Sequence, residues 1–441
     1  MPTLQVSPLG LVPKKAPNEY RVIHHLSYPS GSSINDGIDQ ADRSVSYQTV
    51  DDAVQYIIQY GAGTLMAKTD IEHAYKIVPI HPQDYDLLGF KVGNQFYYDR
   101  TLPMGLSYSC QLFEKFSTAI HWILENKFKI EGCVHILDDF LFLGRPNTTE
   151  CKRNLFTFCE VAAVLGIPIK EAKTVPPTTV ITFLGLELDS ESMEIRLPQD
   201  KLVKLRAELL AMSNRKKVTL HQLQSLIGLL NFACSVVVPG RTFLRRLIDL
   251  TMGLTNPQHF RRLNLEARAD IAAWLVFIEN FNGRALFLPV EFVTSQSLEM
   301  YTDASDLGMG GFFGTHWFCQ EFSPEWLTFP ITVREFLPIV IAIEIWHDKL
   351  RNKRIQFFSD NMAVVYIINK HTSKNPSLMK LMRRFMVNVL KYNILFQAVH
   401  VPGLHNIAAD HLSRLQMEQF FQQFPHMDKD PTHIPPHLLT L

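Results

Sequence analysis

Two adjacent aspartates, Asp138 and Asp139, interrupt the apolar stretch "HILDDFLFLG" at residues 135–144. The runs on either side are typical of short strands, so the pair falls at the tip of a predicted hairpin. Asp is common where strands reverse, and a solvated pair of like charges at such a turn costs little. These ten residues alone leave a simple turn and a functional site as equal alternatives.

Length and composition indicate an ordinary folded protein of several domains. A chain of 441 residues is too long for a single hydrophobic core and predicts two or three domains. Its composition, 46% hydrophobic and 20% charged, is typical of a globular protein. The N-terminus lacks a signal pattern, and no uncharged apolar run approaches the roughly 20 residues that span a bilayer. Six cysteines without a C-x-x-C pair fit a reducing compartment. We therefore expect an intracellular protein of the cytoplasm or nucleus, with no membrane partner.

The net charge is zero, but the charges are unevenly distributed. Residues 199–262 hold eleven lysines and arginines against three acidic residues. Such a segment is a candidate phosphate-binding surface. The alternative is a solvated helical face without a partner.

The order of predicted elements changes twice along the chain. Up to residue 190, strands predicted at 63–71 and 76–82 alternate with helices at 49–61 and 151–166, each helix closed by glycine. A helical region follows, in which Thr219 is the predicted N-cap of one helix. From residue 297 the pattern is strand, glycine-rich hairpin and strand. The Pro-rich tail from 416 predicts a linker.

Upstream of the aspartate pair, Asp70 lies at the end of a predicted strand. Asp70 could be a strand-end turn residue or a helix N-cap. Taken with Asp138 and Asp139, however, it supplies what two-metal phosphoryl transfer needs. Carboxylates on neighbouring strands can hold two Mg²⁺ ions about 4 Å apart, and these cations would neutralise the like charges.

A second acidic set begins in "YTDASDLGMGG" with Asp303 and continues with Glu335, Asp360 and Asp410. Each has a structural alternative. Thr332 and Glu335 match a capping box, Asp360 could cap the following helix, and Asp410 could be a solvated helix residue. Together the four carboxylates would also suit two Mg²⁺ ions.

Several motifs in the first half resemble the palm motifs of reverse transcriptases, in their order and spacing. These are "KTDIEHAY", "TLPMGLSYSCQLFEKF", "HILDDFLFLG", "LGIPIKEAKT" and "ITFLGLEL". The segment at residues 7–36 resembles their fingers subdomain, with a sequence similar to those of gypsy-type and DIRS-like retrotransposons. Residues 298–415, with "TDAS", "SDN" and "N-x-A-A-D-x-L-S-R", resemble a ribonuclease H domain.

The first resemblance implies roles for residues in the palm. Asp70 and Asp138 would be the principal metal ligands, with Asp139 in support. Tyr75 falls where the family has an aromatic residue under the incoming sugar, so its ring would exclude a ribose 2′-hydroxyl. The alternative for Tyr75 is a core position.

Basic residues would bind the triphosphate. The resemblance implies that Arg21 and either Lys14 or Lys15 reach it from the fingers. Lys173 would lie near the leaving group, with a solvated cation as its alternative. The "FLG" at 183–185 would grip the primer end.

Two positions depart from the family. Met104, beside Gly105 in the substrate-binding motif "LPMGL", stands where retroviral enzymes often carry a polar residue, so the template contact there stays open. Many ribonuclease H domains carry a histidine on the loop before the final aspartate. Here Leu404 occupies that position and His405 follows one residue later, so we expect His405 to be a bystander.

The predicted fold is an α+β right-hand polymerase followed by a mixed α/β ribonuclease H-like domain. We expect fingers and palm at 1–190, thumb at 191–260, connection at 261–297, ribonuclease H at 298–415 and tail at 416–441. The implied function is an RNA-directed DNA polymerase and ribonuclease H of a retroelement. It would use two Mg²⁺ per site, with Mn²⁺ as a substitute, and act on template-primer, RNA/DNA hybrid and dNTPs.

Two rival functions follow from the same sequence. A domesticated relic would bind nucleic acid without catalysis, but the presence of all seven carboxylates disfavours it. An RNA-templated RNA polymerase is disfavoured by Tyr75 and by the ribonuclease H-like segment.

Overall fold

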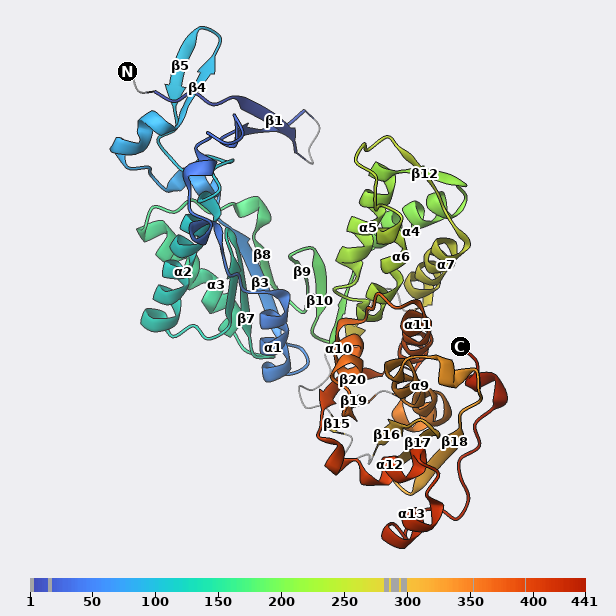
Figure 1. Cartoon of the computed structure of the whole chain (residues 1–441). Helices are drawn as coiled ribbons and strands as arrows, with labels where there is room; N and C mark the ends of the chain where they lie inside the picture. Colours follow the sequence, from blue (N-terminus) through green and yellow to red (C-terminus); the bar gives the residue numbers. More distant parts are fainter. Residues whose placement is uncertain are drawn as a thin grey trace. The chain divides into compact units, whose positions relative to one another are not determined.

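The structure, a computed structural model, describes residues 4–14, 18–280, 300–351, 353–392 and 394–441, with short strands at 285–286 and 293–294 (Figure 1). Lys15 and part of the predicted connection lie outside the described residues. The chain divides into two compact units, Met1–Ile195 and Arg196–Leu441, each described by itself. In the described part of the chain, no helix combines the length and apolar character that crossing a membrane requires.

An antiparallel four-stranded sheet forms the centre of the first unit. Its strand order is β6-β7-β3-β8. Asp70, the last residue of β3, pairs with Asp139, the first of β7. The acidic residues therefore meet at one end of the sheet. The strands are β3 (Leu65–Asp70), β6 (Cys133–Ile136), β7 (Asp139–Gly144) and β8 (Val175–Thr178).

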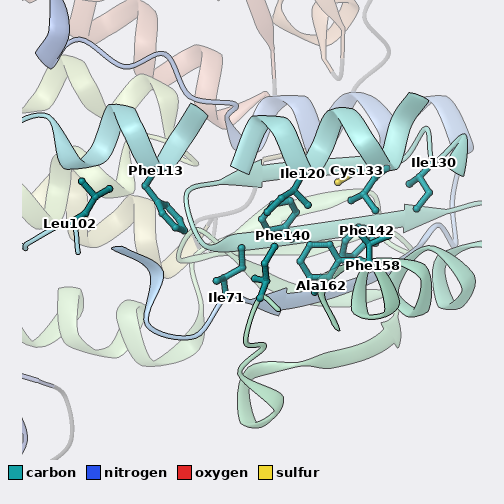
Figure 2. Close-up of a cluster of buried hydrophobic side chains, with 13 residues drawn as sticks. Ile71, Leu102, Phe113, Ile120, Ile130, Cys133, Phe140, Phe142, Phe158 and Ala162 are labelled. Carbon is teal, nitrogen blue, oxygen red and sulfur yellow. The ribbon is translucent and has the colours of Figure 1, made fainter. Parts of the chain in front are cut away.

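Three α-helices accompany this sheet: α1 (Val50–Tyr60), α2 (Ser109–Phe128) and α3 (Glu150–Val164). The predicted helices at 49–61 and 151–166 are confirmed. A capping box of Thr49 and Asp52 begins α1, and Gly61 ends it at a φ of 90°. Figure 2 shows Phe113 and Ile120 of α2 above Phe140 of β7, in one continuous core.

Three strand pairs and, at the end of the unit, the strand β11 accompany this sheet. The pairs are β1 (Leu9–Pro13) with β2 (Tyr20–His24), β4 (Gly89–Val92) with β5 (Gln95–Tyr98), and β9 (Val180–Phe183) with β10 (Leu186–Asp189), while β11 spans Glu194–Arg196. The strand predicted at 76–82 is wrong. Residues Ala74–Ile77 form a 3₁₀ helix, and Pro79 makes a single bridge with Thr101. Pro79 and Pro82 have no N–H for a strand ladder.

The second unit begins with helices: α4 (Gln199–Ser213), α5 (Leu220–Ala233), α6 (Arg245–Asp249) and α7 (Leu265–Asn280). Strands β12 (Lys217–Thr219) and β13 (Phe260–Arg262) pair between them. The predicted N-cap of α5 is confirmed, because Thr219 Oγ1 accepts the Gln222 N–H at 3.2 Å. Buried Asp270 of α7 binds Arg383 Nε at 3.2 Å and Arg246 Nη1 at 3.3 Å, which ties the predicted thumb and connection to the following domain.

A mixed six-stranded sheet dominates the rest of the second unit. Strands β16, β17 and β18 are antiparallel, while β19 runs parallel to β15, β16 and β20. The strands are β15 (Val293–Thr294), β16 (Tyr301–Ala304), β17 (Gly308–Phe313), β18 (His316–Glu321), β19 (Arg354–Ser359) and β20 (Leu395–His400). The helices are α9 (Ile331–Leu350), α10 (Met362–Lys370), α11 (Pro376–Lys391) and α12 (Ile407–Ser413).

The tail differs from the expected linker. Helix α13 (Met417–Gln423) places Phe420 in a buried cluster with Trp317. Further along, Trp317 Nε1 donates to the Asp428 carbonyl at 2.7 Å, and Trp326 Nε1 donates to the Leu439 carbonyl at 2.7 Å. Met417, Phe420, Phe421 and Phe424 join this cluster at helical spacing, an apolar face that the sequence prediction overlooked, while the two tryptophan contacts anchor the segment beyond it.

We predict that Phe420→Ala destabilises the second unit by about 3–5 kcal/mol, the usual cost of truncating a fully buried Phe. Phe420 is 0% exposed. Urea unfolding followed by tryptophan fluorescence measures this, since four of the five tryptophans belong to this unit. Exposed Gln422 in the same helix provides the matched control, Gln422→Ala. Equal stability of the two variants would mean that the tail is not part of the domain.

Candidate active sites

The aspartate pair lies on a two-residue turn that is also an acidic site. Ile136 pairs with Asp139, so Leu137 and Asp138 form the turn between β6 and β7. Asp70 lies opposite on β3, and it is 4% exposed. The two alternatives of the sequence are thus compatible, because the turn brings Asp138 toward the acidic sheet end.

The carboxylates at this sheet end disfavour one another's charge. Burial and the nearby Asp70 raise the pKa of Asp138, and the same causes, with Asp138, raise the pKa of Asp139 to about 6. Lys173 Nζ lies 2.5 Å from Asp70 Oδ2 and offsets part of the negative charge. A carboxylate group with this much repulsion is suited to binding further cations.

A cavity of about 670 Å³ opens beside these acids. It brings together most of the predicted substrate-binding residues with two of the aspartates. His24, Lys76, Asp99 and Lys170 also line it and were not anticipated. Gly105 and Asp139 are not among its lining residues. The predicted residues in the lining are Lys14, Arg21, Asp70, Tyr75, Met104, Asp138 and Lys173.

Tyr75 both lines the cavity and packs against the core. Its hydroxyl lies 3.1 Å from Cys110 Sγ, and its ring meets the Phe113 ring edge-on at 5.4 Å. These contacts fix the orientation of the ring. The core alternative for Tyr75 therefore does not exclude a role at the cavity wall.

Gly105 is required by a close backbone approach. Its φ is 122°, and a Cβ there would lie 1.9 Å from the His24 carbonyl oxygen. The His24 N–H donates to the Met104 carbonyl at 2.7 Å. The glycine thus lets strand β2, which carries Arg21, approach the loop that carries Met104.

The "FLG" segment forms the tight turn between β9 and β10. Phe183 pairs with Leu186, and the two residues between them have φ angles of 49° and 82°. Positive φ at both positions is typical of a two-residue hairpin turn. Its predicted contact with the primer is not tested by this geometry.

The second acidic set lies on four elements of the second unit. Asp303 is in β16, Glu335 in α9, Asp410 in α12, and Asp360 follows β19. Burial, with the charges of Asp360 and Asp410, raises the pKa of Asp303 to about 6. Burial, with Asp360 and Asp303, raises the pKa of Glu335 to about 7. The four carboxylates therefore act on one another electrostatically, although they lie far apart in sequence.

Of the structural alternatives for three of these acids, the structure rules out two helix caps and supports the third, a solvated helix residue. Helix α9 begins at Ile331 after Pro330, so the capping box of Thr332 and Glu335 is not formed. Helix α10 is capped by Asn361, whose Oδ1 accepts the Ala363 N–H at 2.8 Å, rather than by Asp360. Asp410 is 41% exposed and bonds Arg414 Nε at 2.8 Å, so it is a half-solvated helix residue.

Oxygen ligands of this kind fit hard divalent cations. Glu335 Oε2 is buried and has no hydrogen-bond partner among the residues that the structure describes, which a cation would supply. Within those same residues, no group of three His, Cys, Asp or Glu side chains is gathered tightly enough to hold a metal ion by itself.

Two neighbours of the second site were missed from the sequence. Ser413 Oγ donates to Asp303 Oδ2 at 2.6 Å, and His400 Nε2 lies 3.1 Å from the Asp360 carbonyl oxygen. Ser413 is one helical turn after Asp410, which is the signal that could have identified it. His405 ends an exposed 3₁₀ turn, and its role as a bystander stays a prediction.

Comparison with protein families finds two matches. Residues 12–188 match the family described as reverse transcriptase (RNA-dependent DNA polymerase). Residues 293–387 match the RNase H-like domain found in reverse transcriptase.

Two viral proteins are similar over less than half of this chain. Protein P of duck hepatitis B virus (strain China) is 30% identical over 193 residues, which are 43% of this chain and 24% of that protein. The enzymatic polyprotein of Cestrum yellow leaf curling virus is 28% identical over 202 residues, covering 44% of this chain and 29% of that protein. The chain thus spans about a quarter of the length of these relatives. They do not support the gypsy-type or DIRS-like subtype, which stays a prediction.

Solved structures support the predicted fold class. The foamy viral protease-reverse transcriptase in complex with dsDNA matches with a TM-score of 0.52 and 16% identity, over 90% of this chain and 78% of that one. The same viral protein in complex with an RNA/DNA hybrid matches with a TM-score of 0.51 and 15% identity, over 89% of this chain and 50% of that one. The chain therefore contains a reverse transcriptase domain followed by an RNase H-like domain of the kind found in reverse transcriptases.

Proposed function

We propose that this chain is a retroelement RNA-directed DNA polymerase that also cleaves the RNA strand of RNA/DNA hybrids. The observation that carries the proposal is the cavity of the reverse transcriptase domain, where Asp70 and Asp138 lie beside cationic side chains. The substrates would be template-primer, RNA/DNA hybrid and dNTPs. The foamy viral structures, solved with dsDNA and with an RNA/DNA hybrid, support nucleic-acid partners.

Mg²⁺ is the proposed cofactor, two ions per site, with Mn²⁺ as a substitute. When bound, the ions would activate the attacking oxygen and stabilise the leaving group. Asp70, Asp138 and Asp139 would hold them in the polymerase site. Asp303, Glu335, Asp360 and Asp410 would hold them in the nuclease site.

The other cavity residues bind and orient the nucleotide in this proposal. Arg21, Lys14 and Lys173 line the cavity and provide positive charge for a triphosphate. The Tyr75 ring, fixed by Phe113 and Cys110, would block a ribose 2′-hydroxyl. In the nuclease site, Ser413 holds one oxygen of Asp303 in place.

The basic segment 199–262 is the proposed template-primer surface of the thumb. Some of its cations bond within the unit, such as Arg246 with Asp270 and Arg261 with the Leu250 carbonyl. Arg215, Lys216 and Lys217 are exposed at the start of β12. These three are the better candidates for phosphate contacts.

A catalytically inactive nucleic-acid-binding relic remains the alternative function, and the seven carboxylates oppose it. The proposed compartment is the cell interior, cytoplasm or nucleus, which the unpaired state of all six cysteines supports.

We predict that each activity depends on its own acids. Asp138→Asn should lower primer extension on poly(rA)/oligo(dT) at least ~10³-fold, because an amide keeps the shape but loses the charge that binds a cation. Asp303→Asn should remove RNA cleavage from a hybrid and leave extension near wild type. Circular dichroism verifies folding of both variants. Joint loss of both activities in either folded variant would contradict two separate sites.

Sugar selection is tested at Tyr75. Tyr75→Ala should raise the kcat/KM for rNTP relative to dNTP, since removal of a blocking ring relieves the rejected substrate most. Tyr75→Phe keeps the ring and serves as the matched control, with selection near wild type. A ratio unchanged in Tyr75→Ala would leave Tyr75 as a packing residue.

The raised pKa of Glu335, about 7 against an ordinary 4.5, predicts a pH-dependent stability. Between these values the folded state holds a proton that the unfolded state has lost, so stability falls as pH rises through this window. In EDTA, Glu335→Gln should therefore raise the Tm at about pH 8, and the gain should shrink toward about pH 5.

Mg²⁺ should stabilise the wild type more than this variant, because the cation relieves the same repulsion. Exposed Glu325 provides the control Glu325→Gln, which should leave the Tm unchanged at both pH values. A lower Tm for Glu335→Gln than for the wild type at high pH would contradict the claim that the charged form of Glu335 destabilises the fold.

A further inference from the structure

The turn that carries Asp138 has an unusual backbone. Leu137 has a φ of 53°, in the left-handed region that a branched residue rarely adopts. Such a conformation persists only where the surroundings fix it. Its position directly before Asp138 means that any relaxation would move a predicted metal ligand.

Both backbone polar groups of Leu137 are held by one helix. Its N–H donates to Glu114 Oε2 at 2.8 Å, and its carbonyl accepts from Ser117 Oγ at 2.7 Å. Glu114 and Ser117 lie one turn apart on α2, and they are 6% and 0% exposed. Figure 2 shows that α2 packs along the sheet through Phe113 and Ile120, so its position is set by the core.

The carboxylate of Glu114 is backed by the buried imidazole of His135 and the half-buried imidazole of His121. His135 Nε2 lies 3.4 Å from Glu114 Oε1, and His135 Nδ1 lies 2.7 Å from His121 Nδ1. Burial and the neighbouring His135 lower the pKa of His121 to about 4, so His121 is neutral at physiological pH. The backbone N–H of His135 donates to Gln48 Oε1 at 2.8 Å. This network orients Glu114 toward the turn.

Burying a carboxylate on a core helix costs free energy unless hydrogen bonds or opposite charges offset the loss of water. The neighbouring buried positions on the same face, Phe113 and Ile120, are apolar and serve packing. Glu114 instead directs one oxygen at a strained amide, and a charged acceptor makes the stronger hydrogen bond.

We infer that Glu114 and Ser117 are positioning residues, which hold the Leu137–Asp138 turn in the conformation that presents Asp138 to the nucleotide cavity. The inference rests on the proposed polymerase function. Neither residue lines the cavity, so each would act through the turn and not through substrate. A misplacement of a reacting group by about 1 Å can cost ~10²-fold in rate.

The test compares variants at both positions by single-turnover primer extension. Glu114→Met removes the acceptor at similar volume and should lower the kcat ~10²-fold, and Ser117→Ala should lower it ~10-fold. The KM for dNTP should stay within about twofold, because neither substituted residue lines the cavity. Glu114→Gln keeps an acceptor oxygen and should restore most of the rate. RNA cleavage, which belongs to the other unit, should be unchanged.

Ser190→Ala is the matched control. Ser190 is a fully buried serine of the same unit whose hydroxyl donates to the Thr64 carbonyl at 2.6 Å, away from the turn. Ser190→Ala should lower the stability of the protein as Ser117→Ala does, but it should leave kcat unchanged. If Glu114→Met does not fold, Ser117→Ala against Ser190→Ala decides the question. Equal kcat in these two variants would overturn the inference.

Amide hydrogen exchange separates the inference from the proposed function. Exchange at residues 136–139 should rise in Glu114→Met and Ser117→Ala and not in Ser190→Ala. If the wild type is inactive but shows this exchange pattern, the polymerase function is overturned, while the inference that Glu114 and Ser117 fix the turn is supported. An active wild type whose exchange and kcat are unaffected by both variants would overturn the positioning role.

Discussion

Burial of neighbouring carboxylates, together with the repulsion between them, is the constraint on which both candidate sites depend. Asp139, with a pKa near 6, stands opposite Asp70 across a strand pair, and Glu335, with a pKa near 7, faces Asp303 and Asp360. A fold tolerates such groups only where rigid elements hold them and where cations can neutralise them. The two units meet this requirement separately. The first places its acids at the ends of two paired strands and on the turn before one of them, and the second places its acids at two strands and on two helices.

The supporting elements explain why the acids stay in place. In the first unit, α2 packs on the sheet and fixes the turn through Glu114 and Ser117. In the second, Ser413 on α12 bonds Asp303 on β16. Each hydrogen bond joins the site to an element anchored in a core, so packing far from the chemistry determines the geometry of the carboxylates.

Much of this arrangement follows from local sequence signals. The helix closed by Gly61, the cap at Thr219 and the hairpin at Asp138 depend on residues near one another in the chain, and these predictions are confirmed. The hydrogen bonds made by Glu114 and Ser413 join residues 23 and 110 positions apart. No local pattern encodes the first, and the only local signal for the second is the helical spacing between Ser413 and Asp410. In the tail, the apolar spacing of Met417, Phe420 and Phe421 was a local signal that was overlooked, whereas the anchors of the later residues on Trp317 and Trp326 are tertiary contacts.

Proton release on cation binding tests the role of carboxylate repulsion most directly. Titration calorimetry of Mg²⁺ into the intact chain, in buffers of different ionisation enthalpy, counts the protons displaced. Because Asp139, Asp303 and Glu335 have pKa values of about 6, 6 and 7, binding near pH 6 should release about one proton or more, and release should fade by about pH 8.5. Cation binding near pH 6 without proton release would contradict the central role of carboxylate repulsion.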